Sequence, residues 1–235
     1  MTVPRFDPDI ESQHRRLDAD EWDDVYVIGD VHGCRRELDL LLERLGVTAS
    51  DMVVYVGDLV RKGPDSRGVV TLVRDSPNMF SIRGNNEEKL LRGEKHLPEL
   101  TDEDLAYIES LPVAISWQET LVVHGGVDPR KPLAEHDVDD LQNTRSIAPD
   151  GGSYDRPFWF DAYEGPDRVF FGHTPLAVPV RREYAVGLDT GCVYGNELTA
   201  FDWRRDEVTA VPGREIEHRP DSKFVSPRRA VAPTG

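Results

Sequence analysis

The amino-acid sequence predicts an α/β fold in which two packed β-sheets are flanked by helices. Apolar runs of strand length alternate with helical patterns up to about residue 111, and strand-like runs predominate beyond it. Strand–helix units followed mainly by strands favour packed layers around one core. With 235 residues and 38% hydrophobic content, the chain is long enough to bury one sizeable core.

Five apolar runs have the composition of buried strands, as in parallel sheets. They lie at residues 25–28, 52–56, 79–83, 121–123 and 169–171, and the third is the weakest. Shorter β-like runs are found at residues 113–117, 184–188, 198–203 and 208–211. We expect the last two to pair as a hairpin through the turn at residues 204–206.

Helices are predicted after the first three runs. Residues 35–45 carry four leucines at the i, i+3, i+4, i+7 spacing of one helix face, and Gly46 is a typical helix end. Residues 65–75 and 86–91 are expected to form the next two helices. Thr101 begins a further helix, with an aspartate in place of the usual capping-box glutamate.

The chain has neither an internal repeat nor a clear linker, so we expect one domain at residues 25–212. Residues 1–24 are predicted to form a polar N-terminal extension, and residues 213–235 a flexible C-terminal tail. Within the domain, residues 127–166 are rich in Pro, Gly and Asp. We expect them to form a long loop over the functional site.

Sequence features also favour a cytoplasmic location. No segment approaches 18 consecutive apolar residues, and the N-terminus lacks the apolar stretch of a signal peptide. The two cysteines, Cys34 and Cys192, lack metal-type spacing. We do not expect them to form a disulfide in a reducing compartment.

The charge balance is strongly acidic. Asp and Glu total 44 against 28 Lys and Arg, so the net charge is −16, and only five of the 28 cations are lysine. Such a charge should repel nucleic acids and anionic membranes, so neither is an expected partner. An ordinary acidic protein could have this composition, but the Asp-rich, Lys-poor balance favours the surface of a halophilic protein.

Each of the five strand-like runs is followed by a side chain that binds metals, next to a glycine. The six candidate ligands are Asp30, His32, Asp58, Asn85, His124 and His173. In open α/β sheets, ligands bind beyond the carboxyl ends of the strands, so we expect these side chains to converge at one edge of a sheet. Mixed carboxylate and imidazole ligands suit Mn, Fe, Zn or Ni better than Ca or Mg.

These motifs together resemble the calcineurin-like metallophosphoesterase superfamily. They are GDVHG from residue 29, GDLV from 57, RGNNE from 83, VVHGG from 122, FGHTP from 171 and LDTGCVYGNELTAF from 188. The resemblance extends from about residue 26 to 201 and is closest to the phosphoprotein phosphatase branch, which includes bacterial diadenosine tetraphosphatases. It implies the four-layer architecture of that superfamily, and two divalent metal ions that serve phosphoester or phosphoanhydride hydrolysis.

The resemblance also implies a role for each ligand. Asp30 and His32 would bind the first ion, and Asp58 would bridge both. The second ion would be bound by Asn85, His124 and His173. Mn²⁺ is the expected metal, with Fe, Zn or Ni as alternatives.

The sequence departs from the family at the catalytic dyad. In the phosphatases, one motif reads Gly-Asp-x-x-Asp-Arg-Gly and another reads Gly-Asn-His-Glu. The His of the second motif is thought to protonate the leaving group, and the Asp that precedes Arg-Gly in the first motif orients that His. Here Asn86 replaces that His, and Arg61 replaces that Asp. Lys62 retains the charge of the phosphate-binding Arg but loses its bidentate geometry.

Leaving-group chemistry gives these substitutions a meaning. An alcohol leaves as a strong base, with a pKa near that of water at about 15.7, whereas a phosphate leaves as a weak one, at about 6. Losing a general acid therefore harms phosphoserine hydrolysis more than phosphoanhydride cleavage. Arg61 and Lys62 also suit a substrate with several phosphates, unless Arg61 is merely solvated or salt-bridged.

Further substrate contacts are expected around the same site. Arg145 lies in the predicted site loop and, with Lys62 and Asn85, is a candidate phosphate-binding residue. An ordinary surface arginine is the alternative for Arg145. Tyr194 either faces the substrate or packs in the core.

The sequence therefore predicts a two-metal phosphohydrolase acting on phosphoanhydrides, with dinucleoside polyphosphates as the best-fitting substrates. One alternative is a serine/threonine protein phosphatase, whose substrate would be a phosphoprotein. A non-catalytic metal- or nucleotide-binding protein is the alternative of another class: the lost dyad favours it, and the six retained ligands oppose it.

Overall fold

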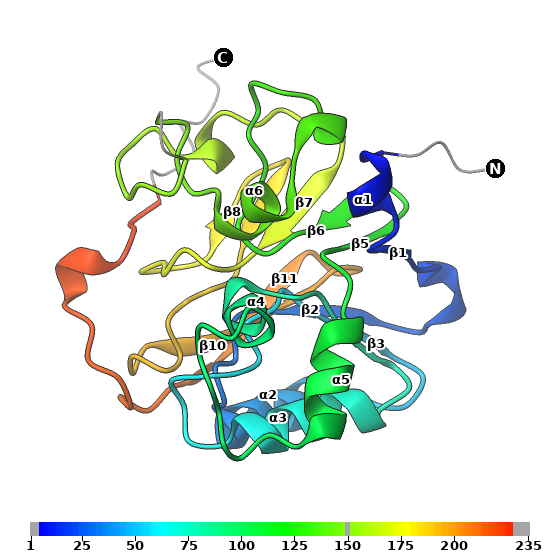
Figure 1. Cartoon of the computed structure of the whole chain (residues 1–235), viewed down its shortest axis with the longest axis vertical. Helices are drawn as coiled ribbons and strands as arrows, with labels where there is room; N and C mark the ends of the chain where they lie inside the picture. Colours follow the sequence, from blue (N-terminus) through cyan, green and yellow to red (C-terminus); the bar gives the residue numbers. More distant parts are fainter. Residues whose placement is uncertain (1–4, 149–150, 228–235) are drawn as a thin grey trace.

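The computed structural model describes residues 5–148 and 151–227 and contains two stacked mixed β-sheets with helices on the outer faces (Figure 1). The five-stranded sheet has the order β11-β10-β2-β3-β4. Its strands are β2 (Val25–Ile28), β3 (Met52–Tyr55), β4 (Met79–Ser81), β10 (Glu197–Asp202) and β11 (Glu207–Pro212). The first three run parallel, and β10 pairs antiparallel with both β2 and β11.

The six-stranded sheet has the order β1-β5-β6-β7-β9-β8. Its strands are β1 (His14–Arg16), β5 (Ala114–Trp117), β6 (Thr120–Val122), β7 (Arg168–Phe171), β8 (Val180–Arg181) and β9 (Ala185–Gly187). The central strands β6, β7 and β9 run parallel. Strand β5 pairs antiparallel with β6 and parallel with β1.

Helices occupy the connections and the outer layers. They are α1 (Pro8–Glu11), α2 (Arg35–Leu45), α3 (Ser66–Asp75), α4 (Asn85–Leu91), α5 (Asp102–Ser110) and α6 (Val138–Asn143). Helices α2, α3 and α5 cover the outer face of the five-stranded sheet (Figure 1). Single 3₁₀ turns lie at Ala19–Glu21, Leu133–Glu135, Trp159–Asp161 and Asp221–Lys223.

Apolar side chains fill the space between the sheets and the space beneath the helices. Val27 and Val54 of one sheet meet Val122 and Phe170 of the other in a fully buried layer. On the outer face, the leucine stripe of α2 packs against the five-stranded sheet, and Gly46 ends the helix with a positive φ of 69°. This layering confirms the α/β class and the two packed sheets predicted from the sequence.

Two segments contribute more to the fold than their sequences suggest. Residues 14–16 lie in the predicted polar extension, yet they form β1 and pair with β5 through backbone hydrogen bonds that need no apolar side chain. Of the predicted tail, residues 213–227 are described, and Val225 is buried and bridged to Leu176. The predicted flexibility of residues 228–235 lies outside the described residues, as do residues 1–4 and, within the predicted loop, 149–150.

Other expectations have plain outcomes. The hairpin of β10 and β11 is confirmed, with Phe201 opposite Val208. The segment predicted as a long loop also contains α6 and two 3₁₀ turns. Cys34 and Cys192 are buried free thiols. Among the described residues, no helix combines the length and the apolar character needed to cross a membrane.

Candidate metal centre

The six candidate ligands lie where the two sheets meet, not at one edge of a single sheet. Asp30, His32, Asp58 and Asn85 follow the strands β2, β3 and β4 of the five-stranded sheet, whereas His124 and His173 follow β6 and β7 of the other. The prediction of one sheet edge is therefore wrong in this respect. A run of apolar residues indicates a strand but does not say which sheet that strand joins.

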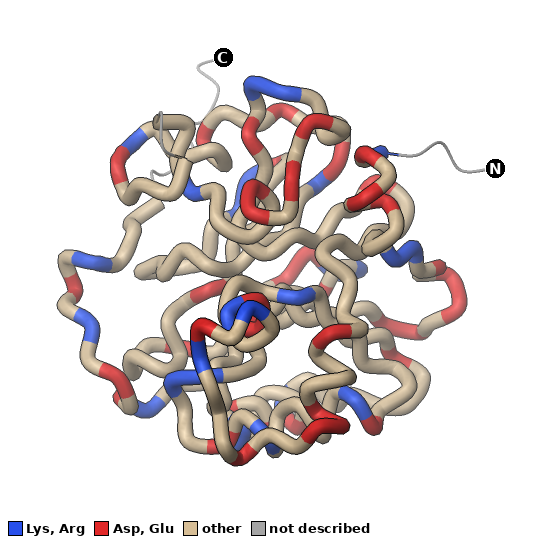
Figure 2. The backbone as a smooth tube through the Cα atoms, viewed as in Figure 1, with Lys and Arg blue, Asp and Glu red and all other residues tan. Residues whose placement is uncertain are grey.

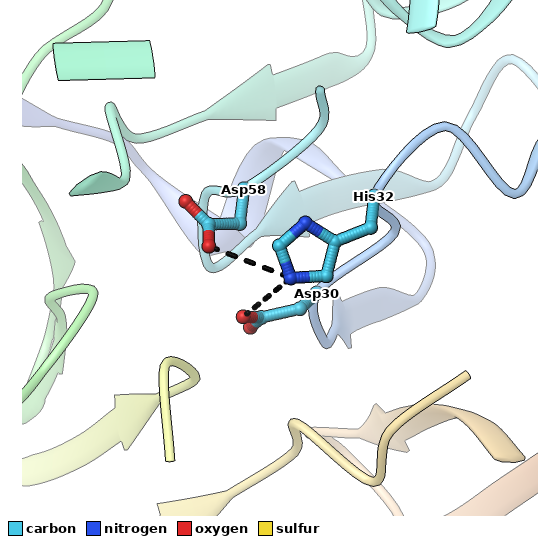
Figure 3. A group of neighbouring side chains, drawn as sticks. All are labelled: Asp30, His32 and Asp58. Atoms are coloured by element: carbon cyan, nitrogen blue, oxygen red, sulfur yellow. Dashed lines mark ion pairs between the residues drawn. The ribbon is translucent and has the colours of Figure 1, made fainter. Parts of the chain in front are cut away.

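Asp30, His32 and Asp58 form the first group of metal-type side chains (Figure 3). One ligand atom from each lies within 4.8 Å of the others, and all three residues are buried. His32 Nε2 lies 3.9 Å from Asp30 Oδ2 and 3.6 Å from Asp58 Oδ2. These spacings leave the three atoms facing a common point, as the ligands of one small cation must.

The second group gathers around the other oxygen of Asp58. His124 Nε2 lies 3.3 Å from Asp58 Oδ1 and 3.1 Å from the side-chain amide of Asn85. The rings of His124 and His173 meet edge to face, with centroids 5.1 Å apart. Asp58 thus presents Oδ2 to the first group and Oδ1 to the second, which is the arrangement that a bridging carboxylate requires.

The histidines are oriented by their second nitrogens. His124 Nδ1 lies 2.7 Å from the carbonyl oxygen of Val56, and His32 Nδ1 lies 3.2 Å from that of Val60. When Nδ1–H donates to a carbonyl, Nε2 keeps a free lone pair aimed at the site, as in metal-binding histidines. His173 Nε2 is buried with no hydrogen-bond partner among the described residues. A buried imidazole with so few partners fits a metal ligand better than a structural histidine.

Protonation also favours cation binding. Burial, helped by the charge of Lys62, lowers the pKa of His32 to about 3, and burial with Arg145 holds that of His173 well below its usual range. Both rings are therefore neutral, as ligands must be. Burial and the nearby Asp189 carboxylate raise the pKa of Asp30. A cation between these carboxylates would offset their repulsion.

Asp58 and His124 form a buried ion pair. Burial opposes ionisation of both groups, but their mutual attraction outweighs it. The pKa of Asp58 is therefore held well below its usual range, and that of His124 is raised to about 9. A bound divalent cation would replace this proton on the imidazole.

Backbone strain is concentrated in the ligand loops. In the described part of the chain, seven non-glycine residues have positive φ, and five of them belong to this site. They are His32, Asp58, Arg61, Lys62 and His173. Such conformations cost of order 1–3 kcal/mol each and persist where the surroundings hold them in place.

Glu87 holds one of these loops. Its buried carboxylate accepts hydrogen bonds from the backbone N–H groups of Asp58 at 2.9 Å, Val60 at 3.1 Å and Gly84 at 2.8 Å. Burial, together with the Asp58 carboxylate, raises its pKa to about 7. Sequence reasoning left this positioning residue out, although it belongs to the RGNNE motif.

Two glycines permit the close approach of the ligands. A Cβ atom on Gly172 would lie 1.9 Å from Asp30 Oδ1, and one on Gly84 would lie 2.4 Å from Asp58 Oδ1. Both distances are shorter than any contact a real Cβ makes. The recurrence of glycine beside the metal-type side chains thus has a steric cause.

The residues at the altered dyad positions contact each other and Asp58. Arg61 Nη1 donates to Asn86 Oδ1, and Asn86 Nδ2 donates to Asp58 Oδ2. The backbone N–H of Asn86 also donates to Asp58 Oδ1 at 2.9 Å. A carboxamide has no proton to release near neutral pH, so the hydrogen bonds from Asn86 orient Asp58 without supplying a general acid.

A cavity of about 190 Å³ opens above these side chains and is rich in cations. Of the ten predicted site residues, those that line it are His32, Asp58, Arg61, Lys62, Asn85, Asn86, Arg145 and His173. Asp30 and His124 are buried beside them. Arg145 Nη2 lies 3.4 Å from His173 Nδ1, so the predicted site loop does reach the site.

Six further residues line this cavity, and Pro175 and the Asp189 carboxylate are two of them. Tyr194, whose role the sequence left open, faces it: the Lys62 ammonium lies 5.2 Å from the centre of its ring. Lys89, Tyr154 and Arg219 were missed. Lys89 follows Asn85 by one helical turn, a spacing that could have been noticed, and its Nζ lies 2.9 Å from the Asn85 amide. Tyr154 and Arg219 carry no local signal.

Comparisons with known proteins agree with this geometry. The profile described as calcineurin-like phosphoesterase matches residues 24–211. The chain is 28% identical to a bis(5′-nucleosyl)-tetraphosphatase PrpE (asymmetrical) of Oceanobacillus iheyensis, over 81% of this chain and 93% of the relative. It is 30% identical to serine/threonine-protein phosphatase 1 of Salmonella typhimurium, over 80% of this chain and 96% of the relative.

Solved structures give the same result. One crystal structure, provisionally described as a diadenosine tetraphosphatase, superposes on this protein with a TM-score of 0.77 and 30% sequence identity. The match covers 86% of this chain and 98% of that one. Because the family profile spans most of the chain and the fold and site agree with it, this protein belongs to the calcineurin-like phosphoesterase family.

Proposed function

We propose that this protein is a two-metal phosphohydrolase that cleaves phosphoanhydride bonds in dinucleoside polyphosphates. The observation that carries the proposal is the hydrogen-bonded chain Arg61–Asn86–Asp58. Positions 61 and 86, where the family has its catalytic dyad, here supply neither an acidic proton nor a carboxylate to orient one. Substrates whose leaving group needs no proton are the ones that such a site serves best.

The ligand geometry supports two divalent ions. Asp30 and His32 would hold the first, Asn85, His124 and His173 the second, and Asp58 both. Mn²⁺ suits these mixed oxygen and nitrogen ligands, with Fe, Zn or Ni as alternatives. When bound, two ions supply activation of water and stabilise charge on the attacking and leaving oxygens.

The protein's own cations would bind the phosphate chain. Five of them line the cavity: Arg61, Lys62, Lys89, Arg145 and Arg219. Burial opposes the charge on Lys62, but Asp58 and Tyr194 outweigh it and hold its pKa above its usual range. A lysine that stays charged here serves as a fixed partner for phosphate oxygens.

The five cations stand out in a protein of net charge −16. Figure 2 shows acidic segments in most of the outer loops of both layers. A phosphate chain with several negative charges gains more from such a local cluster than a single phosphate does. The relatives named bis(5′-nucleosyl)-tetraphosphatases support the same substrate class.

A serine/threonine protein phosphatase is the second candidate. The relative of that name in Salmonella typhimurium, which is 30% identical, favours it. Its substrate would leave as an alkoxide and would require a proton donor. The Asn86 amide does not meet that requirement.

A direct rate comparison tests the proposal. With saturating Mn²⁺, kcat/KM for diadenosine tetraphosphate should exceed that for a phosphoserine peptide by at least about 10²-fold, the lower end of what general-acid catalysis supplies. If the phosphoserine peptide is the better substrate, the leaving-group argument fails and the protein-phosphatase assignment replaces it.

We further propose a cytoplasmic, halophilic protein. The support is the acidic, lysine-poor composition, because self-repulsion among such charges weakens as salt screens them. Its melting temperature should then rise from dilute buffer to molar KCl. A protein that is most stable in dilute buffer would contradict the halophilic assignment.

A further inference from the structure

We propose that the large cavity beside the metal centre binds a nucleoside of the substrate, with its base held by Tyr154, Tyr194 and Arg219. The inference rests on the proposed function and deepens it. The cavity has a volume of about 840 Å³, and part of its wall comes from the C-terminal segment at residues 217–226. Its size falls within the ~300–1,000 Å³ range of small-molecule sites.

The metal centre itself lacks the room for a dinucleotide. Its own cavity measures about 190 Å³, less than the ~300 Å³ at which small-molecule sites usually begin. A dinucleoside polyphosphate with its phosphates above Asp58 must therefore extend beyond it. The two cavities share Tyr154, Tyr194 and Arg219 as a common wall, so the larger one lies directly on that path.

The shared wall has the chemistry that stacks nucleobases. The Arg219 guanidinium lies 5.5 Å from the ring centre of Tyr154, 5.4 Å from that of Tyr194 and 5.7 Å from that of Phe224. Flat aromatic rings and guanidinium planes are the groups on which proteins stack unpaired bases. Tyr154 also lies 4.7 Å from the Arg145 guanidinium, which links the base site to the phosphate-binding cations.

The C-terminal segment is anchored, so the cavity has a built wall. The N–H groups of Ile216 and Glu217 both donate to the Val193 carbonyl oxygen at 3.0 Å. Eight residues further on, the N–H of Val225 donates to the carbonyl oxygen of Pro175 at 2.8 Å. These contacts tie the segment to the loops that carry Tyr194 and His173.

Within the segment, Arg219 is fixed by its neighbours. Its Nη2 and Nε donate to the Lys223 carbonyl oxygen at 2.8 and 3.2 Å. These bonds hold the guanidinium carbon within 5.7 Å of the centres of all three rings. Figure 2 shows basic and acidic positions alternating along this segment, at the left of the view. The cavity wall is therefore not a purely anionic surface that would repel a nucleotide.

Tyr154 is the residue to change, because its side chain is 45% exposed and its loss should not impair folding. Tyr154→Ala removes the ring, and Tyr154→Phe keeps it. Tyr184→Ala is a matched control, since Tyr184 is partly exposed and lines neither cavity. All variants are assayed with saturating Mn²⁺ on diadenosine tetraphosphate and on inorganic tripolyphosphate, which has no base.

The expected result is a change in the ratio of kcat/KM values for the two substrates. In Tyr154→Ala, kcat/KM for diadenosine tetraphosphate divided by kcat/KM for tripolyphosphate should fall by about tenfold, because the stacking of the base on the ring is lost. Tyr154→Phe and Tyr184→Ala should stay within about twofold of wild type. An equal loss on both substrates, or none, would overturn the proposal.

A binding measurement separates this inference from the proposed function. Labelled adenosine, which has no phosphate, should bind the Mn²⁺-loaded wild type in equilibrium dialysis, and Tyr154→Ala should weaken that binding by about tenfold. If adenosine binds in this way but the tetraphosphate is not cleaved, the proposed function fails and the site stands. If the tetraphosphate is cleaved and adenosine binds both proteins equally or not at all, the site fails and the proposed function stands.

Discussion

Installing the family dyad should restore phosphoester hydrolysis. The double variant Arg61→Asp with Asn86→His introduces an imidazole beside Asp58, where the Asn86 amide now donates to Asp58 Oδ2. It also introduces a carboxylate at the position whose side chain contacts Asn86. Position 61 has a φ of 71°, a region that aspartate adopts more readily than most residues. The backbone therefore suits the new pair.

The magnitude follows from general-acid catalysis. A positioned acid contributes roughly 10²–10⁴-fold where a proton must be delivered. Because the double variant is not optimised, we expect the lower end, a rise of up to about 10²-fold in kcat for a phosphoserine peptide. For diadenosine tetraphosphate kcat should change little, because its leaving phosphate needs no proton. Its KM should rise, since one of the five cations of the cavity becomes an anion.

The assay is phosphate release at saturating Mn²⁺, with kcat and KM determined separately for both substrates. Each single variant serves as a control and should gain less than the pair, because an acid without its orienting partner is poorly positioned. The reasoning is refuted if the double variant retains its metal but hydrolyses the phosphoserine peptide no faster than wild type. An equal gain in kcat on both substrates would refute it as well.

Three further predictions follow from the site and the fold. Asp58→Asn should abolish turnover while the circular dichroism spectrum stays native, because one residue serves both proposed ions; an active variant would rule out bridging by Asp58. Gly172→Ala should weaken Mn²⁺ binding by roughly 10–100-fold in calorimetric titration, since its Cβ would lie 1.9 Å from Asp30 Oδ1; unchanged affinity would mean that Asp30 is not a ligand. Burial, with the charge of Arg16, lowers the pKa of His14 to about 4, so the stability that its neutral form confers is complete above about pH 6.5 and is lost as the pH falls toward 4. Between pH 7.5 and pH 5.0, the free energy of unfolding measured in urea should therefore fall more for wild type than for His14→Gln. An equal fall in the two proteins would contradict this prediction.

Local signals predicted most of the fold. The apolar runs before Asp30, Asp58 and His124 became β2, β3 and β6, because continuous apolar residues have few other places to go than a buried strand. The leucine stripe before Gly46 and the cap at Thr101 marked their helices within a residue. These features are encoded within about ten residues of chain, so they can be read without tertiary structure.

Long-range pairings could not be predicted in this way. Strand β1 is polar, and only its backbone pairing with β5 makes it a strand. The C-terminal segment contributes Arg219 to the site and is held by backbone hydrogen bonds to Val193 and Pro175, which leave no periodic pattern in the sequence. The sharing of the ligands between two sheets is likewise a matter of topology. The candidate ligands were nevertheless found, because each stands beside a glycine at a strand end.

The central claim is that Asp58 bridges two ions, and anomalous diffraction at the manganese edge from crystals grown with Mn²⁺ tests it most directly. The account predicts two peaks per chain, about 3.5–4 Å apart. One should be bound by Asp30 and His32, the other by Asn85, His124 and His173, with Asp58 between them. A single peak in crystals of a fully active protein, or two peaks that do not share Asp58, would contradict the account.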